Sequence, residues 1–193
     1  MKIITISREY GAGGREIGMK TAEALGIEFY DRDIISAAAR ESDIDVERIR
    51  REGEEISASE SFLRSITPIS YDQKDTIFEA QKQVVLSLAA KGPCVILGRC
   101  ADMILTEAGV DSLNVFIHAD EVHRAFRVGE DIGSRNPSDI ARVMRRTDRA
   151  RRAYYEHYTG ARWGDCRNYT MTLDSGLLGT DRCVALICAV VRE

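Results

Sequence analysis

The sequence has no pair of cysteines with CxxC spacing, and its five cysteines are an odd number. Cys94, Cys183 and Cys188 stand in apolar runs, which is typical of buried free thiols. The three histidines are scattered along the chain, so they indicate neither a metal site nor a catalytic triad. The lack of finger-like spacing argues against a zinc site, and we expect no protein-held metal site.

The sequence also lacks an excess of positive charge and any long hydrophobic run. Its 27 Lys and Arg against 31 Asp and Glu give a net charge of −4. This net charge gives the whole chain no attraction to nucleic acid or to anionic membranes. Affinity for phosphates must therefore come from a local cluster of basic residues. The opening MKIITISREYG has only a short apolar stretch before its polar residues, which suits neither a signal peptide nor a membrane span. We therefore expect a cytoplasmic protein.

Repeats, low-complexity tracts and linkers are missing too, and 193 residues suit a single domain over residues 1–193. Residues 2–7 read as a buried strand, 14–25 as a helix that Gly26 ends, 27–30 as a second strand, and another helix begins at Asp31. Residues 43–70 are polar and poorly periodic, and we expect short helices and a mobile segment there. The later elements are a helix over 72–91, strands over 94–97 and 113–117, a basic helix over 137–157, a strand over 168–173 and a closing helix over 179–191. This alternation predicts an α/β fold whose parallel sheet, of about five strands between helices, has its ligand site at the strands' carboxyl ends.

A glycine-rich loop separates the first strand from the first helix. Glycines can take positive φ and turn their N–H groups inward, and the helix that follows adds the positive end of its dipole. A phosphate group is the natural occupant of such a loop, although a tight strand-to-helix turn would use glycines as well. The residues that we expect to bind the phosphates of a nucleotide are Ser7, Arg8, Gly11, Ala12, Gly13, Gly14, Arg15 and Glu16.

This loop departs from the common GxxxxGK[ST] motif of phosphate-binding loops. Arg8 stands at the motif's first glycine, and Gly14 stands where the motif has lysine. Arg15 follows one position later, and Glu16 comes directly after it. A guanidinium grips phosphate oxygens through a fork of donors, so we expect Arg15 to take over the role of the lysine.

Several segments resemble one family of phosphotransferases. ITISREYGAGGREIG and FYDRDII near the start, VILGRCAD at 95–102, VFIHAD at 115–120 and RRTDRARRAYYEHYTGARWGDCRNY look like the cytidylate kinase-like proteins. That family is a divergent branch of the P-loop nucleoside monophosphate kinases, and the segments run through nearly the whole chain in the expected order. The match to this branch is closer than the match to true cytidylate kinases.

The resemblance implies transfer of the γ-phosphoryl group of ATP to a nucleoside monophosphate such as CMP or dCMP, with Mg²⁺. It implies an acceptor-binding insert at about 36–70 and a lid at about 135–167. Asp31 and Arg99 match the family's acceptor-site residues, and Asp102 lies close to Cys100, which replaces the aspartate of a Gly-Arg-Asp motif. The turn at Asp174 and Ser175 resembles one that lies near the adenine. The partner is thus a small nucleotide, and a homo-oligomer stays possible.

An arginine stripe supports a lid independently of the resemblance. At 100° per residue, Arg142, Arg145, Arg146, Arg149 and Arg152 fall within about a third of the helix circumference, whereas Arg151 points away from them. Like charges on one face repel each other, and a triphosphate would relieve this repulsion. We therefore expect Arg145, Arg149 and Arg152 to act with Arg15 in catalysis, although a solvated charged face and a nucleic-acid face are alternatives.

Other functions stay open at this level. The chain could phosphorylate another small acceptor, or it could be a nucleotide-binding regulatory domain without efficient transfer. The missing lysine favours the regulatory alternative.

Overall fold

The computed structural model describes residues 3–31 and 71–192 of the chain. The helix predicted to begin at Asp31 and the predicted acceptor-binding insert at 36–70 lie outside the described residues. Within the described ranges, no helix is long and apolar enough to cross a membrane.

Five parallel strands form one sheet in the order β2-β3-β1-β4-β5, as the alternating pattern predicted. The central strand β1 pairs with β3 on one side, where Ile4 lies opposite Val95, and with β4 on the other, where Ile6 lies opposite Val115. The strands are β1 (Ile3–Arg8), β2 (Glu28–Tyr30), β3 (Cys94–Leu97), β4 (Ser112–His118) and β5 (Met171–Asp174).

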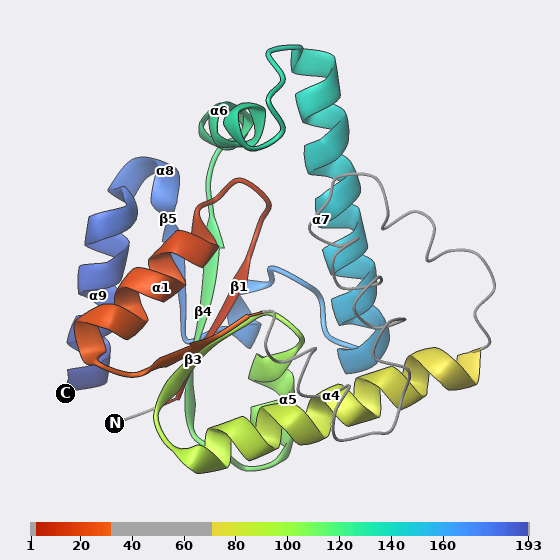
Figure 1. Cartoon of the computed structure of the whole chain (residues 1–193), viewed down its shortest axis with the longest axis vertical. Coiled ribbons are helices and arrows are strands. Elements are labelled where there is room, and N and C mark those ends of the chain that lie inside the picture. The colour runs from red at the N-terminus through yellow and green to blue at the C-terminus, as the bar shows by residue number, and fades with distance from the viewer. Residues whose placement is uncertain (1–2, 32–70, 193) are drawn as a thin grey trace.

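Helices cover both faces of this sheet (Figure 1). The helix α1 packs with α9 on one face, and α4 packs with α5 on the other. The helices are α1 (Gly14–Leu25), α4 (Tyr71–Lys91), α5 (Ala101–Glu107), α6 (Glu121–Asp131), α7 (Pro137–Thr159), α8 (Ser175–Leu178) and α9 (Thr180–Arg192). The fold class is therefore the three-layer α/β arrangement that the sequence predicted.

Strand β1 shows why the two faces differ. The side chains of Ile4 and Ile6 are fully buried in the cluster that contains α1 and α9, whereas Ile3 belongs to the cluster with α4 and α5. Thr5 is a buried polar exception, and its hydroxyl donates to the Asn114 side-chain oxygen of β4 at 2.7 Å. A run of β-branched residues thus suits a strand that is covered on both sides.

Two element boundaries near the C-terminus differ from the predictions. The last strand begins at Met171 because Cys166–Asn168 forms a 3₁₀ turn, which the Asp165 side chain caps through the Arg167 N–H at 3.1 Å. The closing helix predicted over 179–191 is found as α9, but a short helix that was not predicted, α8, precedes it, and Gly179 with a φ of 76° separates the two. Asp165 and Gly179 are visible in the sequence as turn residues, but the position at which each one ends or begins an element depends on the packing of the neighbouring strand.

The long helix α7 is well delimited. The Asn136 side chain accepts a hydrogen bond from the Ser138 N–H at 3.1 Å, Pro137 occupies the first turn, and Gly160 ends the helix with a φ of 63°. Its buried side chains, among them Ile140 and Met144, set its rotation against α6 and the sheet. That rotation decides which arginines of α7 reach the site.

Candidate functional site

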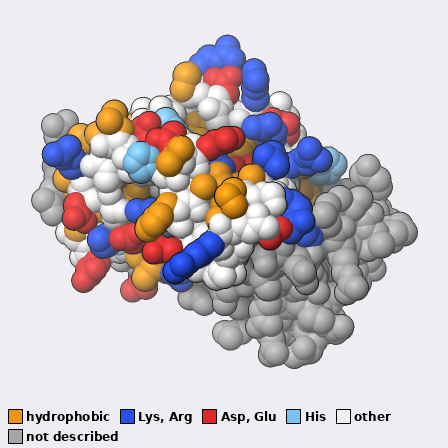
Figure 2. Space-filling model, turned by 90° about the horizontal axis from the view of Figure 1, so that it is seen from above, with side chains coloured by type: hydrophobic (Ala, Val, Ile, Leu, Met, Phe, Trp, Pro, Cys, Tyr) orange, Lys and Arg blue, Asp and Glu red, His pale blue; other side chains and the backbone are white. Residues whose placement is uncertain are grey.

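A cleft of about 1770 Å³ opens at the carboxyl ends of the strands. Its lining includes Arg8 at the end of β1, Leu97 at the end of β3, Ala119 just after β4 and Ser175 just after β5. Figure 2 looks onto the end of the molecule that carries α6, where basic side chains lie among acidic and hydrophobic ones. Parallel sheets bind ligands at this edge, so the cleft is the candidate site.

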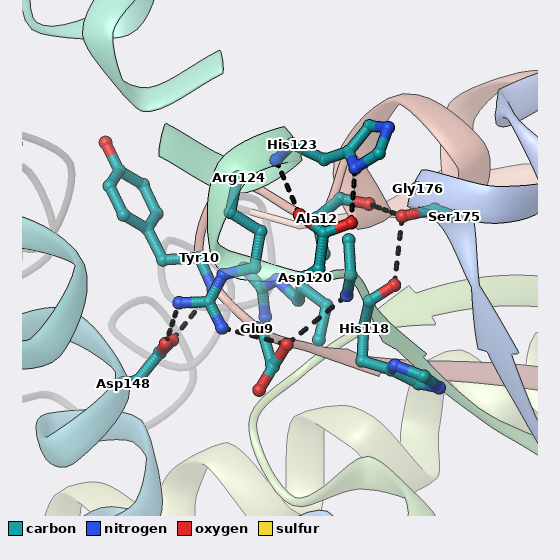
Figure 3. Close-up of polar contacts among 12 residues, drawn as sticks. Glu9, Tyr10, Ala12, His118, Asp120, His123, Arg124, Asp148, Ser175 and Gly176 are labelled. Carbon is teal, nitrogen blue, oxygen red and sulfur yellow. Dashed lines mark hydrogen bonds and ion pairs between the residues drawn. The ribbon is translucent and has the colours of Figure 1, made fainter. Parts of the chain in front are cut away.

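The glycine-rich loop forms one wall of the cleft. Gly11 and Gly13 have φ values of 79° and 70°, in the left-handed region that favours glycine. Ala12 is buried between them, and its carbonyl accepts a hydrogen bond from the Ser175 hydroxyl at 2.7 Å. The same hydroxyl lies 3.1 Å from the His118 carbonyl at the end of β4 (Figure 3). The loop is thus tied to the ends of β4 and β5.

The glycines also let two arginine side chains come close to the loop. A Cβ atom at Gly13 would lie 2.5 Å from Nη1 of Arg127, and a Cβ atom at Gly14 would lie 2.6 Å from Cβ of Arg8. Arg127 is a residue of α6, and it holds Glu16 at 3.1 Å. The loop therefore needs glycines for close packing as well as for backbone conformation.

Arg8 and Arg151 form a pair of neighbouring cations in the cleft. Arg151 of α7 donates to the Arg8 carbonyl at 3.0 Å and lies over the Tyr10 ring at 5.5 Å. Burial and the nearby Arg151 lower the pKa of Arg8 well below its usual range, and burial also lowers the pKa of Arg151. Guanidinium groups stay protonated in proteins, so burial and the neighbouring cation both act against the charge of Arg8, and a bound anion would stabilise it.

A second charged cluster holds the loop from behind, and we call Glu9, Arg124 and Asp148 the brace (Figure 3). The buried Arg124 of α6 contacts Glu9 at 2.8 Å and Asp148 of α7 at 2.5 Å. Asp148 also accepts the Tyr10 backbone N–H at 2.8 Å, and Glu9 accepts the Ala119 N–H at 3.3 Å. The brace therefore joins the loop to β4, α6 and α7.

Arg15 and Asp31, predicted to serve different parts of the site, contact each other. Arg15 Nε lies 3.0 Å from Asp31 Oδ2, and the Arg15 side chain is 62% exposed. Both residues line the cleft, but Arg15 lies toward Asp31 and Met19 rather than across the loop. Its predicted role as the replacement for the lysine gains no support from this position.

The loop after β3 supplies the opposite wall. Gly98, Arg99 and Cys100 line the cleft with φ values of 75°, 60° and 56°, so three successive residues are left-handed. Such backbone costs about 1–3 kcal/mol for each residue other than glycine and is common at functional sites. Burial raises the pKa of the Cys100 thiol, which favours its protonated form.

Asp102 lies beneath this wall and is absent from the cleft lining. Its side chain is buried and accepts the Tyr155 hydroxyl at 2.8 Å. Burial raises the pKa of Asp102, although the Tyr155 hydrogen bond opposes this shift. Tyr155 itself lines the cleft, so Asp102 can act on a ligand through Tyr155.

The predicted arginine stripe of α7 is not brought to the cleft. Arg145, Arg149 and Arg152 are exposed and are absent from its lining, whereas Val143, Thr147 and Arg151 line it. Arg152 instead lies over the Trp163 ring at 5.8 Å. The reason is rotation, because burial of Ile140 and Met144 turns the stripe outward.

Three arginines that the sequence reasoning missed surround the loop, namely Arg124, Arg127 and Arg151. A signal was available for Arg151, since it shares the helix face of Ile140 and Met144 and must point toward the body of the protein. Arg124 and Arg127 closely follow the fourth strand, whose carboxyl end lies at the cleft edge, so their position in the sequence is a signal for a place near the site.

The residues fit a nucleoside triphosphate better than a protein-held metal. The loop and its arginines offer donors for phosphate oxygens, and glycines leave the room that a Cβ would fill. In the described part of the chain, no group of three His, Cys, Asp or Glu could hold a metal ion. Mg²⁺ usually keeps several waters and binds through substrate phosphates, so phosphates rather than carboxylates would hold it here.

The comparisons agree with this geometry. The model of a family described as cytidylate kinase-like matches residues 3–177. The search of curated proteins gives no match.

Three solved structures share the fold. An uncharacterized protein from Eubacterium ventriosum ATCC 27560 is 24% identical over 100% of this chain and 99% of that chain, with a TM-score of 0.75. A gluconokinase from Sinorhizobium meliloti 1021 is 18% identical over 99% and 95% of the two chains, with a TM-score of 0.54. A shikimate kinase from Acinetobacter baumannii in complex with shikimate is 16% identical over 100% and 93%, with a TM-score of 0.53. The fold is thus that of the P-loop kinases.

Proposed function

The chain belongs to the cytidylate kinase-like family, and from this premise we propose that it transfers the γ-phosphoryl group of ATP to a nucleoside monophosphate such as CMP or dCMP. The observation that carries the proposal is the glycine loop at the sheet's carboxyl edge, with Arg8 and Arg151 crowded beside it. Crowded guanidinium groups over a loop of backbone donors suit a polyphosphate.

The donor nucleotide would place its phosphates against the loop from Gly11 to Gly14. Backbone N–H groups and the start of α1 would bind phosphate oxygens. Val122 and Phe126 of α6 are 79% and 70% exposed, and both line the same cleft, as Gly176 does. They offer an apolar surface for a flat base, in agreement with the adenine position that the turn at Asp174 and Ser175 suggests.

The acceptor would bind on the other side of the loop, beside Arg99 and Asp31. Arg99 is a cation suited to the acceptor's phosphate, and Asp31 accepts hydrogen bonds, as a base or a sugar would require. The segment at 36–70 would complete this side as the acceptor-binding insert, and residues 135–167 would form the lid. In this proposal, Arg145, Arg149 and Arg152 reach the phosphates only when the lid moves.

Phosphoryl transfer requires that the two nucleotides be held in position and that the negative charge on the transferring group be neutralised. An oxygen of the acceptor phosphate attacks the γ-phosphorus, the bond from the γ-phosphorus to the bridging oxygen breaks, and ADP leaves. Arg8 and Arg151 would neutralise charge on the transferring group, while the brace holds the loop still. Mg²⁺, when bound to the phosphates, would neutralise part of their charge.

A coupled assay of ADP release tests the proposal. All ribo- and deoxyribonucleoside monophosphates serve as acceptors, and gluconate and shikimate serve as comparison acceptors because kinases with those names share the fold. We expect turnover with a pyrimidine monophosphate. ATP binding by calorimetry without turnover of any acceptor would refute the kinase and leave the regulatory domain.

The regulatory domain is the second candidate because Gly14 stands at the lysine position. A domain that only senses ATP needs the donor loop but no neutralisation of a transferring group. Its signature would be tight ATP binding that the Arg99→Gln variant leaves unchanged, together with no release of ADP by the wild-type protein.

A further inference from the structure

Two departures of the loop from the common motif, Arg8 and Gly14, lie next to each other in space. The motif has glycine at position 8 and lysine at position 14, whereas this chain has Arg8 and Gly14. A Cβ atom at Gly14 would lie 2.6 Å from Cβ and 2.8 Å from Cγ of Arg8. A lysine at 14 and an arginine at 8 therefore exclude each other in this conformation, and the exchange has to involve both positions.

The Arg8 side chain crosses the cleft from one wall to the other. Its Cδ would lie 3.6 Å from a Cβ at Gly14, and its Nη1 would lie 2.5 Å from a Cβ at Gly98 in the loop after β3. The guanidinium group thus lies between the donor loop and the wall that carries Arg99. A phosphoryl group that passes from donor to acceptor has to cross this space.

The charges around Arg8 favour an anionic ligand over a structural ion pair. After burial, Arg151, Arg99 and Arg15 each act to lower the pKa of Arg8, and Asp31 is the carboxylate that acts to raise it. Asp31 is itself held by Arg15 at 3.0 Å. Asp148 also acts on Arg151, so two carboxylates stand among these four cations. The net positive charge that remains is one that phosphate oxygens would neutralise.

We propose that Arg8 binds the transferring phosphoryl group in place of the motif's lysine, and that Gly14 is a glycine so that the Arg8 side chain can pass over it. This inference rests on the proposed function. It replaces the role first expected of Arg15, whose exposed side chain pairs with Asp31. Arg8 and Gly14 then form a permuted version of the loop, with the cation supplied from the strand's end instead of the helix's start.

The test restores the motif's residues, glycine at position 8 and lysine at position 14. The variants are Arg8→Gln, Arg8→Gly, Arg8→Lys and the double variant R8G/G14K, and Arg142→Gln is the control because Arg142 is exposed on α7. Turnover is measured with the best acceptor, and thermal unfolding is followed with and without ATP. Removal of one charge-stabilising donor at a transferring group costs about 100-fold in rate, so we expect this loss for Arg8→Gln.

The other expected results separate a binding role from a structural one. Arg8→Gln should leave the ligand-free unfolding temperature unchanged or higher, because it removes one of several crowded cations, and it should shrink the rise caused by ATP. R8G/G14K should turn over at least about 10-fold faster than Arg8→Gly if lysine resumes its role. Arg8→Lys, which retains the charge, should exceed Arg8→Gln even if the double variant does not fold.

Three outcomes would overturn the inference. The first is an Arg8→Gln variant that turns over as fast as the wild-type protein. The second is a double variant R8G/G14K that folds but is no faster than Arg8→Gly. The third is a loss of activity in Arg8→Gln that is matched by a lower ligand-free unfolding temperature. A wild-type protein without turnover would instead refute the proposed function. Wild-type turnover with an unaffected Arg8→Gln would refute this inference alone.

Discussion

Replacement of Arg124 by methionine should destabilise the protein, because the brace would lose its one cation. Arg124 is 7% exposed, and the side chains of Glu9 and Asp148 are 27% and 15% exposed. Burial acts against the charge of Arg124, but Asp148 and Glu9 outweigh it and raise its pKa. Methionine fills similar space and leaves both carboxylates without their guanidinium.

The magnitude follows from the burial of these three groups. Breaking a fully buried ion pair costs about 3–5 kcal/mol. Since Glu9 and Asp148 retain some contact with solvent, we expect a loss of about 2–3 kcal/mol in the free energy of unfolding. The matched control is Arg142→Met, whose side chain is 72% exposed and whose pairing with Asp139 should contribute less than about 1 kcal/mol.

Urea unfolding at several pH values measures both variants. Burial already raises the folded-state pKa of Asp148, and the loss of the Arg124 guanidinium in Arg124→Met would raise this pKa further. A raised folded-state pKa means that stability falls as pH rises, so the deficit of the variant should be full at neutral pH and shrink toward pH 4. A deficit below about 1 kcal/mol at neutral pH, or one equal to the control's, would refute the reasoning.

Three further predictions concern the cleft and its walls. Gly13→Ala should lower stability by about 1–2 kcal/mol, because alanine is strained at positive φ, and should weaken ATP binding in calorimetry by displacing Arg127; unchanged ATP affinity would contradict this. Asp102→Asn should stabilise the protein at neutral pH. Burial raises the folded-state pKa of Asp102, so wild-type stability falls as the pH rises above the ordinary pKa of an aspartate. This advantage in thermal unfolding should vanish below about pH 4, and a constant advantage would argue against the buried charge. Arg151→Gln should slow turnover at least about 10-fold, and the control Arg142→Gln, whose side chain is exposed on α7, should stay within about 2-fold; equal losses would contradict the role of Arg151.

Local pattern was enough to predict the sheet and the glycine loop. Residues 3–8 are β-branched and apolar except at their end, and the change to helical spacing at Gly14 coincides with the start of α1. Both signals depend on neighbours in the sequence, because a strand's side chains alternate and a helix's repeat every 3.6 residues. The parallel sheet, which the structure confirms, followed from the alternation of such elements, whereas the order of its strands was not predicted.

The partners of the loop could not be predicted in the same way. Arg15 looked like the replacement for the lysine because it is adjacent in the sequence, yet it pairs with Asp31. Arg8 reaches Gly98 and Arg151 reaches the Arg8 carbonyl through contacts that span 90 or more residues. Such contacts depend on how helices rotate and where strands end.

The sequence by itself determined that a strand, a glycine turn and a helix would present backbone donors to an anion. The reason is that turn geometry and the helix dipole are local properties. Only the tertiary structure decided which cations share that anion, because the burial of Ile140 and Met144 rotates α7 so that Arg151 faces inward and Arg149 outward. The sequence shows which basic residues the chain contains, and the packing of the helices decides which of them lie beside the glycine loop.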